Sequence, residues 1–233
     1  MSHIKNVQSL EKLLGICTGF GESYQPGKQK LQVEAMAALV SQAQQCLREV
    51  AAAKAAFNSA TNSREFVFDS LGPLRPRLIG ALIASGVPQA TVDDARVFVR
   101  KFNGYKGTDR DPLPSEATSR ARRARGLDYV SLAGHFEELL MALSDAEGYD
   151  PGQEDLLLSA LEENLTAIRV SNSRVAEAMH HLYLARNKRD DLLYRQPDSA
   201  YQVVRMAKEF IKSVYGLSST EYRAVKGLTF DKR

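Results

Sequence analysis

The feature that most constrains this chain is a stretch from Lys28 to Ser70 that contains neither proline nor glycine. Because these two residues interrupt helices most strongly, a run of this length without them predicts one long helix. Its seam residues recur every three or four positions, the period of one helix face, and their spacing is close to the heptads of a coiled coil. The predicted seam comprises Leu31, Ala35, Leu39, Gln42, Cys46, Val50, Ala53, Phe57, Ala60, Arg64, Val67 and Leu71.

A second stretch of the same kind, from Gln153 to Arg195, predicts a second long helix. Each helix would have about 40 residues and a length of roughly 60 Å. The second seam comprises Leu156, Ala160, Ala167, Val175, Ala178, Leu182, Ala185 and Leu192. Such narrow apolar stripes do not stabilise a helix alone, so we expect both long helices to pack against others.

The two long stretches belong to an internal repeat with an offset of 125 residues, in which Tyr24 to Gly27 recurs as Tyr149 to Gly152. Further matched pairs are Leu31/Leu156, Ala35/Ala160, Val50/Val175, Ala51/Ala176, Ala60/Ala185, Asn62/Asn187 and Arg64/Arg189. We interpret residues 1–105 and 128–233 as two copies of one helical unit, joined by a charged, Pro- and Arg-rich linker at 106–127. The alternative is a compositional echo between two Ala-rich helices.

Shorter helices are expected around each long one, at 7–17, at 74–85 and from Gln89 or Thr91 to Phe102 in the first copy, and at 128–144, 199–215 and 219–225 in the second. The predicted fold class is therefore all-α, with at most a small two-stranded piece at 102–105 and 227–230. We expect the two copies to pack about a pseudo-two-fold axis as a helical bundle with one shared core.

Charge is distributed unevenly along the chain. Residues 1–105 carry 12 basic and 8 acidic side chains, residues 106–127 carry 6 and 3, and residues 128–233 carry 13 and 17. The net charges are thus +4, +3 and −4. This polarity would steer the halves onto each other or onto a second copy of the chain.

The sequence indicates a cytoplasmic protein with no membrane partner. No apolar run approaches the roughly 18 residues that a membrane helix needs, and the N-terminus is too polar for a signal peptide. Cys17 and Cys46 lack a C-x-x-C spacing, so we expect free thiols in a reducing compartment.

Two sets of arginines are the candidate interaction residues. In the first, Asn62/Arg64 and Asn187/Arg189 recur near the ends of the two long helices. These arginines would either pack their stems and reach water, or together hold a carboxylate or a partner. In the second, Arg120, Arg122, Arg123 and Arg125 cluster in the linker, where they would contact nucleic-acid phosphates or dock on the acidic second copy.

Metal and catalytic chemistry have little support in the sequence. Glu177 and His180 form a Glu-x-x-His pair, but the equivalent positions of the first copy are Ala52 and Ala55, so half of a di-iron site would be missing. The neighbouring His181, and His135 with Glu138, are no more persuasive. No phosphate-binding loop or nucleophile motif occurs, so we expect no cofactor, no metal and no enzyme activity.

A resemblance rests on 185–189, Leu193-Tyr194, the run 208–216, and Ser218, Ser219, Tyr222 and 225–230. These residues resemble a group of uncharacterised, Ala-rich, internally duplicated helical proteins of about this length associated with Bacteroidetes. The first copy departs from the pattern, with Phe68-Asp69 where Leu-Tyr would stand. The resemblance implies a helical fold and no catalytic residue.

The function expected from these features is that of a non-enzymatic helical scaffold or protein–protein interaction protein, with an unknown protein or a second copy as partner. The alternatives are a nucleic-acid-associated protein acting through the Arg-rich linker and a metal-dependent enzyme using Glu177 and His180.

Overall fold

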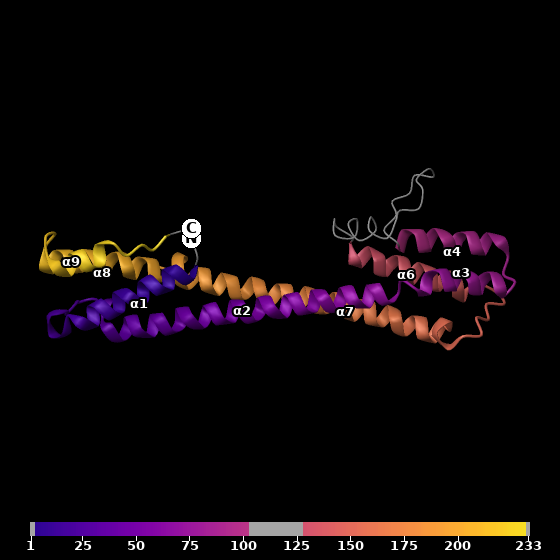
Figure 1. Cartoon of the computed structure of the whole chain (residues 1–233), viewed down its shortest axis with the longest axis horizontal. Helices are drawn as coiled ribbons and strands as arrows, with labels where there is room; N and C mark the ends of the chain where they lie inside the picture. Colours follow the sequence, from indigo (N-terminus) through magenta and orange to yellow (C-terminus); the bar gives the residue numbers. More distant parts are fainter. Residues whose placement is uncertain (1–2, 103–127, 232–233) are drawn as a thin grey trace. The chain divides into compact units, whose positions relative to one another are not determined.

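The computed structural model describes residues 3–102 and 128–231 (Figure 1). All regular secondary structure in these two ranges is helical, which confirms the all-α prediction. The major helices are α1 (His3–Gly19), α2 (Val33–Ser70), α3 (Leu74–Ala84), α4 (Gln89–Phe102), α6 (Tyr129–Ser144), α7 (Leu158–Asp190), α8 (Ala200–Tyr215) and α9 (Thr220–Lys226).

Helix ends follow local chemistry. The side chains of Asp128 and Ser219 accept hydrogen bonds from the backbone N–H groups of Val130 and Tyr222 at the starts of α6 and α9, as N-cap residues do. Glycines follow the ends of α3 and α8. Gly86 and Gly216 have φ angles of 73° and 89°, in the region that favours glycine.

The two long helices are shorter than predicted, for different reasons. Short 3-10 helices, η2 (Gln29–Leu31) and η3 (Glu154–Leu156), precede them, and each is followed by one extended residue before α2 or α7 begins. At its other end α7 widens into a π-helical segment, η4 (Asp191–Arg195). The absence of proline and glycine excluded a sharp break but did not reveal these changes of helix type.

The described chain forms two compact units. Unit 1 comprises residues 1–57 and 178–233, and unit 2 comprises residues 58–177. Each unit contains parts of both predicted copies, so the compact units do not coincide with the expected halves 1–105 and 128–233. The prediction of one shared core is wrong, because there are two separate hydrophobic clusters. A helix of 38 residues spans about 57 Å, more than one small core can cover.

In unit 1, helices α1, α8 and α9 lie along the first part of α2 (Figure 1). The core residues are Val7, Leu10, Leu13, Cys17, Tyr24, Leu31, Met36, Val40, Ala43, Leu193, Tyr194, Ala200, Val203, Val204, Ala207, Ile211 and Val225. The start of α1 contacts the last described residue here, since buried Asn6 donates to Tyr194 Oη and to the Asp231 carbonyl, both at 2.9 Å.

In unit 2, helices α3, α4 and α6 pack with the last turns of α2 and the first part of α7 (Figure 1). The core is rich in leucine and is centred on Phe136, Leu139 and Leu143 of α6. Its other members include Phe68, Leu71, Leu78, Leu82, Val92, Ala95, Leu132, Leu156, Leu161, Leu165 and Ile168. Large branched side chains therefore fill both units, and each unit has its own interior.

The predicted seam is correct for parts of both long helices. Cys46, Leu71, Val175 and Leu182 are buried. At the start of α2, however, the buried residues are Met36, Val40 and Ala43, whereas Gln42 is exposed. In α7 the predicted Ala167 is exposed beside buried Ile168. These segments pack against several helices at once, so the buried face is wider than one seam and its centre is shifted by about one residue.

The corners before the two long helices repeat the same hydrogen bonds at an offset of 125 residues. Tyr24 Oη donates to the Leu31 carbonyl at 3.0 Å, and Tyr149 Oη donates to the Leu156 carbonyl at 2.8 Å. The backbone bonds also correspond in the pairs Tyr24→Gly21 and Tyr149→Ala146, Leu31→Lys28 and Leu156→Gln153, Gln32→Gln29 and Leu157→Glu154, and Met36→Gln32 and Leu161→Leu157.

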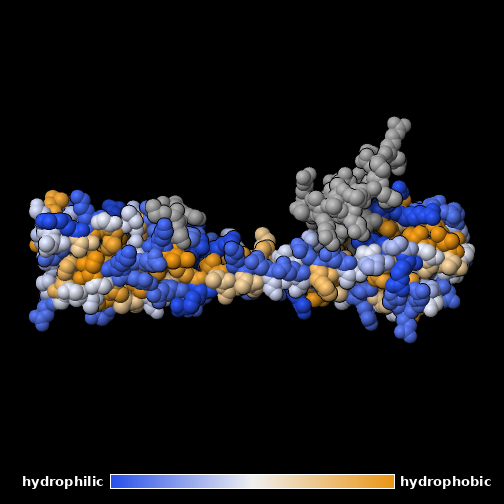
Figure 2. All heavy atoms as spheres, viewed as in Figure 1, coloured by the Kyte–Doolittle hydropathy of each residue, from blue (hydrophilic) through white to orange (hydrophobic). Residues whose placement is uncertain are grey.

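None of the helices in the described residues is long and apolar enough to cross a membrane. Cys17 and Cys46 are both free and buried. Space-filling atoms coloured by hydropathy show that apolar side chains also come to the surface in each unit (Figure 2). Among the most exposed are Phe66, Val130 and Leu217.

Candidate functional site

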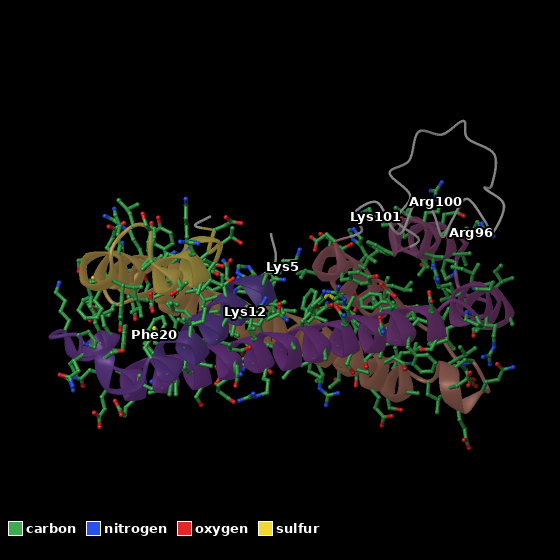
Figure 3. The ribbon with its side chains drawn as sticks, turned by 60° about the vertical axis from the view of Figure 1, so that its left-hand side comes forward. Lys5, Lys12, Phe20, Arg96, Arg100 and Lys101 are labelled. Carbon is green, nitrogen blue, oxygen red and sulfur yellow. The ribbon has the colours of Figure 1, made fainter. Side chains whose placement is uncertain are left out.

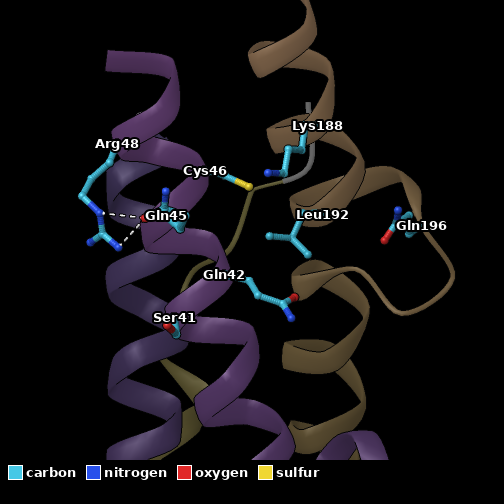
Figure 4. Close-up of a pocket in the computed structure, with 8 residues that line it drawn as sticks. All are labelled: Ser41, Gln42, Gln45, Cys46, Arg48, Lys188, Leu192 and Gln196. Carbon is cyan, nitrogen blue, oxygen red and sulfur yellow. Dashed lines mark hydrogen bonds between the residues drawn. The ribbon is translucent and has the colours of Figure 1, made fainter. Parts of the chain in front are cut away.

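A surface pocket of about 520 Å³ lies in unit 1, between α2 and the end of α7 (Figure 4). Its lining residues are Ser41, Gln42, Gln45, Cys46, Arg48, Lys188, Leu192 and Gln196. Cys46 and Gln42 extend from α2 toward Lys188 and Leu192 (Figure 4). The pocket thus combines a small nonpolar part with a rim of amides and cations, a composition that is suited to binding a polar group.

A hydrogen-bonded chain joins the two helices at the rim. Arg48 Nη2 donates to Gln45 Oε1 at 2.9 Å, and Gln45 Nε2 donates to Glu49 Oε1 at 3.2 Å. Lys188 Nζ from α7 donates to both Glu49 oxygens, at 2.9 and 3.1 Å. The hydrogen bond from Lys188 holds the pKa of Glu49 below its ordinary value and raises the pKa of Lys188. With two cations and one carboxylate, this four-residue network has a net charge of +1.

Cys46 is the one cysteine among the lining residues, and its surroundings do not activate the thiol as a nucleophile. Its side chain is buried, and burial raises the pKa of the thiol above its ordinary value. A reactive cysteine needs the opposite shift, because the thiolate is the nucleophile. No histidine lies among the lining residues of this pocket. The arrangement therefore favours binding over covalent chemistry.

The structure places the first predicted arginine, Arg64, in unit 2. Its guanidinium carbon lies 3.9 Å from the centroid of the Tyr129 ring, which is a cation–π contact. Phe68 packs edge-on against the same tyrosine, with 4.8 Å between the ring centroids of Phe68 and Tyr129. Arg64 thus packs with an aromatic cluster, and Asn62 near it is exposed.

The second predicted arginine, Arg189, lies in unit 1 and is buried. Its Nε and Nη2 atoms lie 2.9 and 2.7 Å from Asp190 Oδ1. Asn187, two residues earlier, is half-buried. Arg64 and Arg189 therefore have different partners in different units, and no site within one unit contains both.

The predicted cluster of Arg120, Arg122, Arg123 and Arg125 lies outside the described residues, so its role stays a prediction. Other basic side chains occupy the outer faces of two helices, Lys5 and Lys12 on α1 and Arg96, Arg100 and Lys101 on α4 (Figure 3). On α4 two of the three are near carboxylates, with Arg96 2.8 Å from Asp93 and Lys101 3.9 Å from Glu138.

The side chains considered for a metal are on the surface. Glu177, His180 and His181 are exposed, and His135 lies 3.2 Å from Glu138, which also pairs with Lys101. In the described ranges there is no group of three or more His, Cys, Asp or Glu side chains that could hold a metal ion.

Sequence reasoning missed the pocket. The spacing of Gln45, Arg48 and Glu49 gave a partial signal, since residues three and four apart are neighbours on a helix. The contribution of Lys188 has no signal in the sequence, because that contribution depends on how α7 packs against α2.

No protein family model, no curated protein and no solved structure matches this chain. The resemblance to Ala-rich helical proteins from Bacteroidetes therefore stays a prediction.

Proposed function

We propose that the chain is a cytoplasmic, non-enzymatic helical scaffold that binds other proteins. One observation carries this proposal: α2 and α7 each contribute to two compact units that have separate cores. Each unit offers its own surface, and the same two helices belong to both. This construction suits a protein that joins partners more than one that encloses a substrate.

We further propose that the chain is an internal duplication in which each unit combines segments of both copies. The first part of one copy and the last part of the other would build each unit. Support comes from the corners, where Tyr24 and Tyr149 make the same hydrogen bond and the 3-10 helices η2 and η3 precede the long helices at the same offset. The glycines that follow α3 and α8 support the same relation.

An exposed aromatic side chain provides a test of the scaffold function. Phe66 of α2 is 76% exposed, which is unusual for a large apolar residue, and aromatic residues often anchor protein interfaces. The full chain should capture a defined set of proteins from its host. Phe66→Ser should reduce the recovery of at least one of them, whereas Glu65→Gln, on an exposed neighbour, should not.

Circular dichroism must show that both variants remain folded. The scaffold proposal fails if the wild-type chain captures nothing beyond an unrelated helical control protein. Quantitative binding with each purified candidate would then separate direct partners from indirect ones.

A further inference from the structure

The two corners that precede the long helices have the same backbone hydrogen bonds and opposite charge. We define corner 1 as residues 24–32 and corner 2 as residues 149–157. Corner 1 contains two lysines and no acidic residue, whereas corner 2 contains Asp150, Glu154 and Asp155 and no basic residue. At equivalent positions Lys30 corresponds to Asp155, and Gln29 corresponds to Glu154. Opposite charges at matched positions make the electrostatic potentials of the two corners complementary.

Part of this charge is neutralised within each unit. Lys30 pairs with Asp198 in unit 1. Asp155 accepts two hydrogen bonds from Arg77 in unit 2, at 2.5 and 2.8 Å, and these bonds hold its pKa below the ordinary value. Lys30 and Asp155, the matched residues of opposite charge, therefore each have an ion-pair partner within their own unit.

The remaining charges face solvent. Lys28 in corner 1, and Asp150 and Glu154 in corner 2, are all exposed. The side chains of these three residues make no ion pair with another residue in 3–102 or 128–231. Among the described residues, corner 1 thus presents one positive charge without an ion pair, and corner 2 presents two negative charges without one.

The charge of each whole unit has the same sign as its corner. Unit 1 has 17 basic and 10 acidic residues, a net charge of +7, and unit 2 has 14 and 18, a net charge of −4. If only residues 3–102 and 128–231 are counted, the numbers are 15 and 10 in unit 1 and 8 and 15 in unit 2, which gives +5 and −7. The field of each unit would therefore steer its corner toward the opposite corner.

Exposed leucines add apolar area at both places. Leu157, the last residue of corner 2, is 42% exposed. Near corner 1, Tyr215 Oη donates to the Ser23 carbonyl at 3.0 Å, and Leu217, two residues later, is 67% exposed. A contact between the corners would bury apolar surface as well as pair charges.

We infer that corner 1 of one molecule docks on corner 2 of a second copy of this chain. Contacts between like corners would place equal charges together and are disfavoured, so the contact joins two different surfaces. The inference rests on the proposed scaffold function and names a second copy as one partner.

Sedimentation velocity of the full chain tests the inference with Lys28→Glu and Glu154→Lys. Neither side chain has an ion pair to lose within the part of the chain that the structure describes. Wild-type protein should self-associate at low salt and dissociate at about 1 M salt, where the screening length is about 3 Å. Each single variant should weaken association about tenfold, because a repulsion replaces an attraction.

Complementation makes the test specific. An equimolar mixture of the two single variants should associate, and the double variant should regain most of the wild-type affinity. Lys54→Glu, an equal charge reversal at an exposed position of α2 outside the corners, should have a smaller effect than Lys28→Glu. A monomeric wild-type chain at low salt, or single variants that do not complement, would overturn the inference.

Duplex DNA is the competing anionic partner. The inference would also be overturned if the wild-type chain stays monomeric, binds DNA in a salt-sensitive way, and loses this binding in Lys28→Glu. The scaffold proposal has a separate readout, because host proteins can still be captured by a chain that does not self-associate.

Discussion

The tyrosines of the two corners provide the sharpest test of how this fold is held together. Tyr24→Phe and Tyr149→Phe each remove one hydroxyl group and leave the ring in place. Tyr24 Oη donates to the Leu31 carbonyl and Tyr149 Oη to the Leu156 carbonyl. Both bonds fix the chain just before a long helix, so their loss should destabilise the unit that contains them.

The two magnitudes should differ because the two hydroxyl groups differ in burial. Tyr24 is 6% exposed, so water cannot easily replace its hydroxyl at the Leu31 carbonyl. We expect Tyr24→Phe to lower the free energy of unfolding by about 2 kcal/mol, a typical cost for a buried group left without its partner. Tyr149 is only half-buried, so Tyr149→Phe should cost about 1 kcal/mol.

Urea unfolding of the full chain, followed by circular dichroism, measures these losses. Amide hydrogen exchange should assign the Tyr24→Phe effect to unit 1 and the Tyr149→Phe effect to unit 2. The control is Tyr183→Phe, since Tyr183 is 62% exposed. If both corner variants unfold at the same urea concentration as this control, the corner hydrogen bonds do not support the fold as we describe.

Three further tests, with five substitutions in all, concern the seam, the contact between Arg64 and Tyr129, and the ion pair between Arg77 and Asp155. Val175→Asp should destabilise the chain by about 3 kcal/mol, because Val175 is buried. Val50→Asp should cost only about 1 kcal/mol, because Val50 is half-buried. Thermal melts that show equal losses of stability for the two variants would contradict this difference in burial. A double-mutant cycle of Arg64→Ala and Tyr129→Leu should give a coupling of about 0.5–2 kcal/mol from the cation–π contact, and zero coupling would exclude it. Arg77→Ala should raise the pKa of Asp155 toward its ordinary value, as an NMR titration would show. Since the folded pKa is lowered, the contribution of Asp155 to stability is present above the unfolded pKa and is lost as the pH falls through the folded pKa.

Most of the helices could be predicted from sequence because their ends are encoded locally. Asp128 and Ser219 cap the starts of α6 and α9, and Gly86 and Gly216 follow the ends of α3 and α8, so these positions lie close to the observed boundaries. The π-helical segment η4 carries no such local signal. The division into two units also could not be predicted, because a repeat in the sequence does not say which copy a segment packs against.

The interaction residues were harder to predict than the helices, and Arg64 and Arg189 show why. Their equivalence in the sequence is clear, but the side chain that each contacts is set by its neighbours. Arg64 contacts the ring of Tyr129 in unit 2, whereas Arg189 pairs with Asp190 in unit 1. A repeat can therefore conserve the position of an arginine while its partner diverges.

The pocket in unit 1 is a second place where the two copies differ in their side chains. Its residues Arg48, Lys188 and Gln196 correspond at the offset of 125 to Ser173, Ser63 and Leu71, so the cations and one amide have no counterparts in the other copy. The segment equivalent to η4 is 66–70, which belongs to the regular helix α2. The π-helical segment and the pocket therefore occur together in unit 1, where Leu192 of η4 and Gln196 line the pocket. If the chain is a duplication, the copies kept their corners for folding and diverged in the surfaces that they offer to partners.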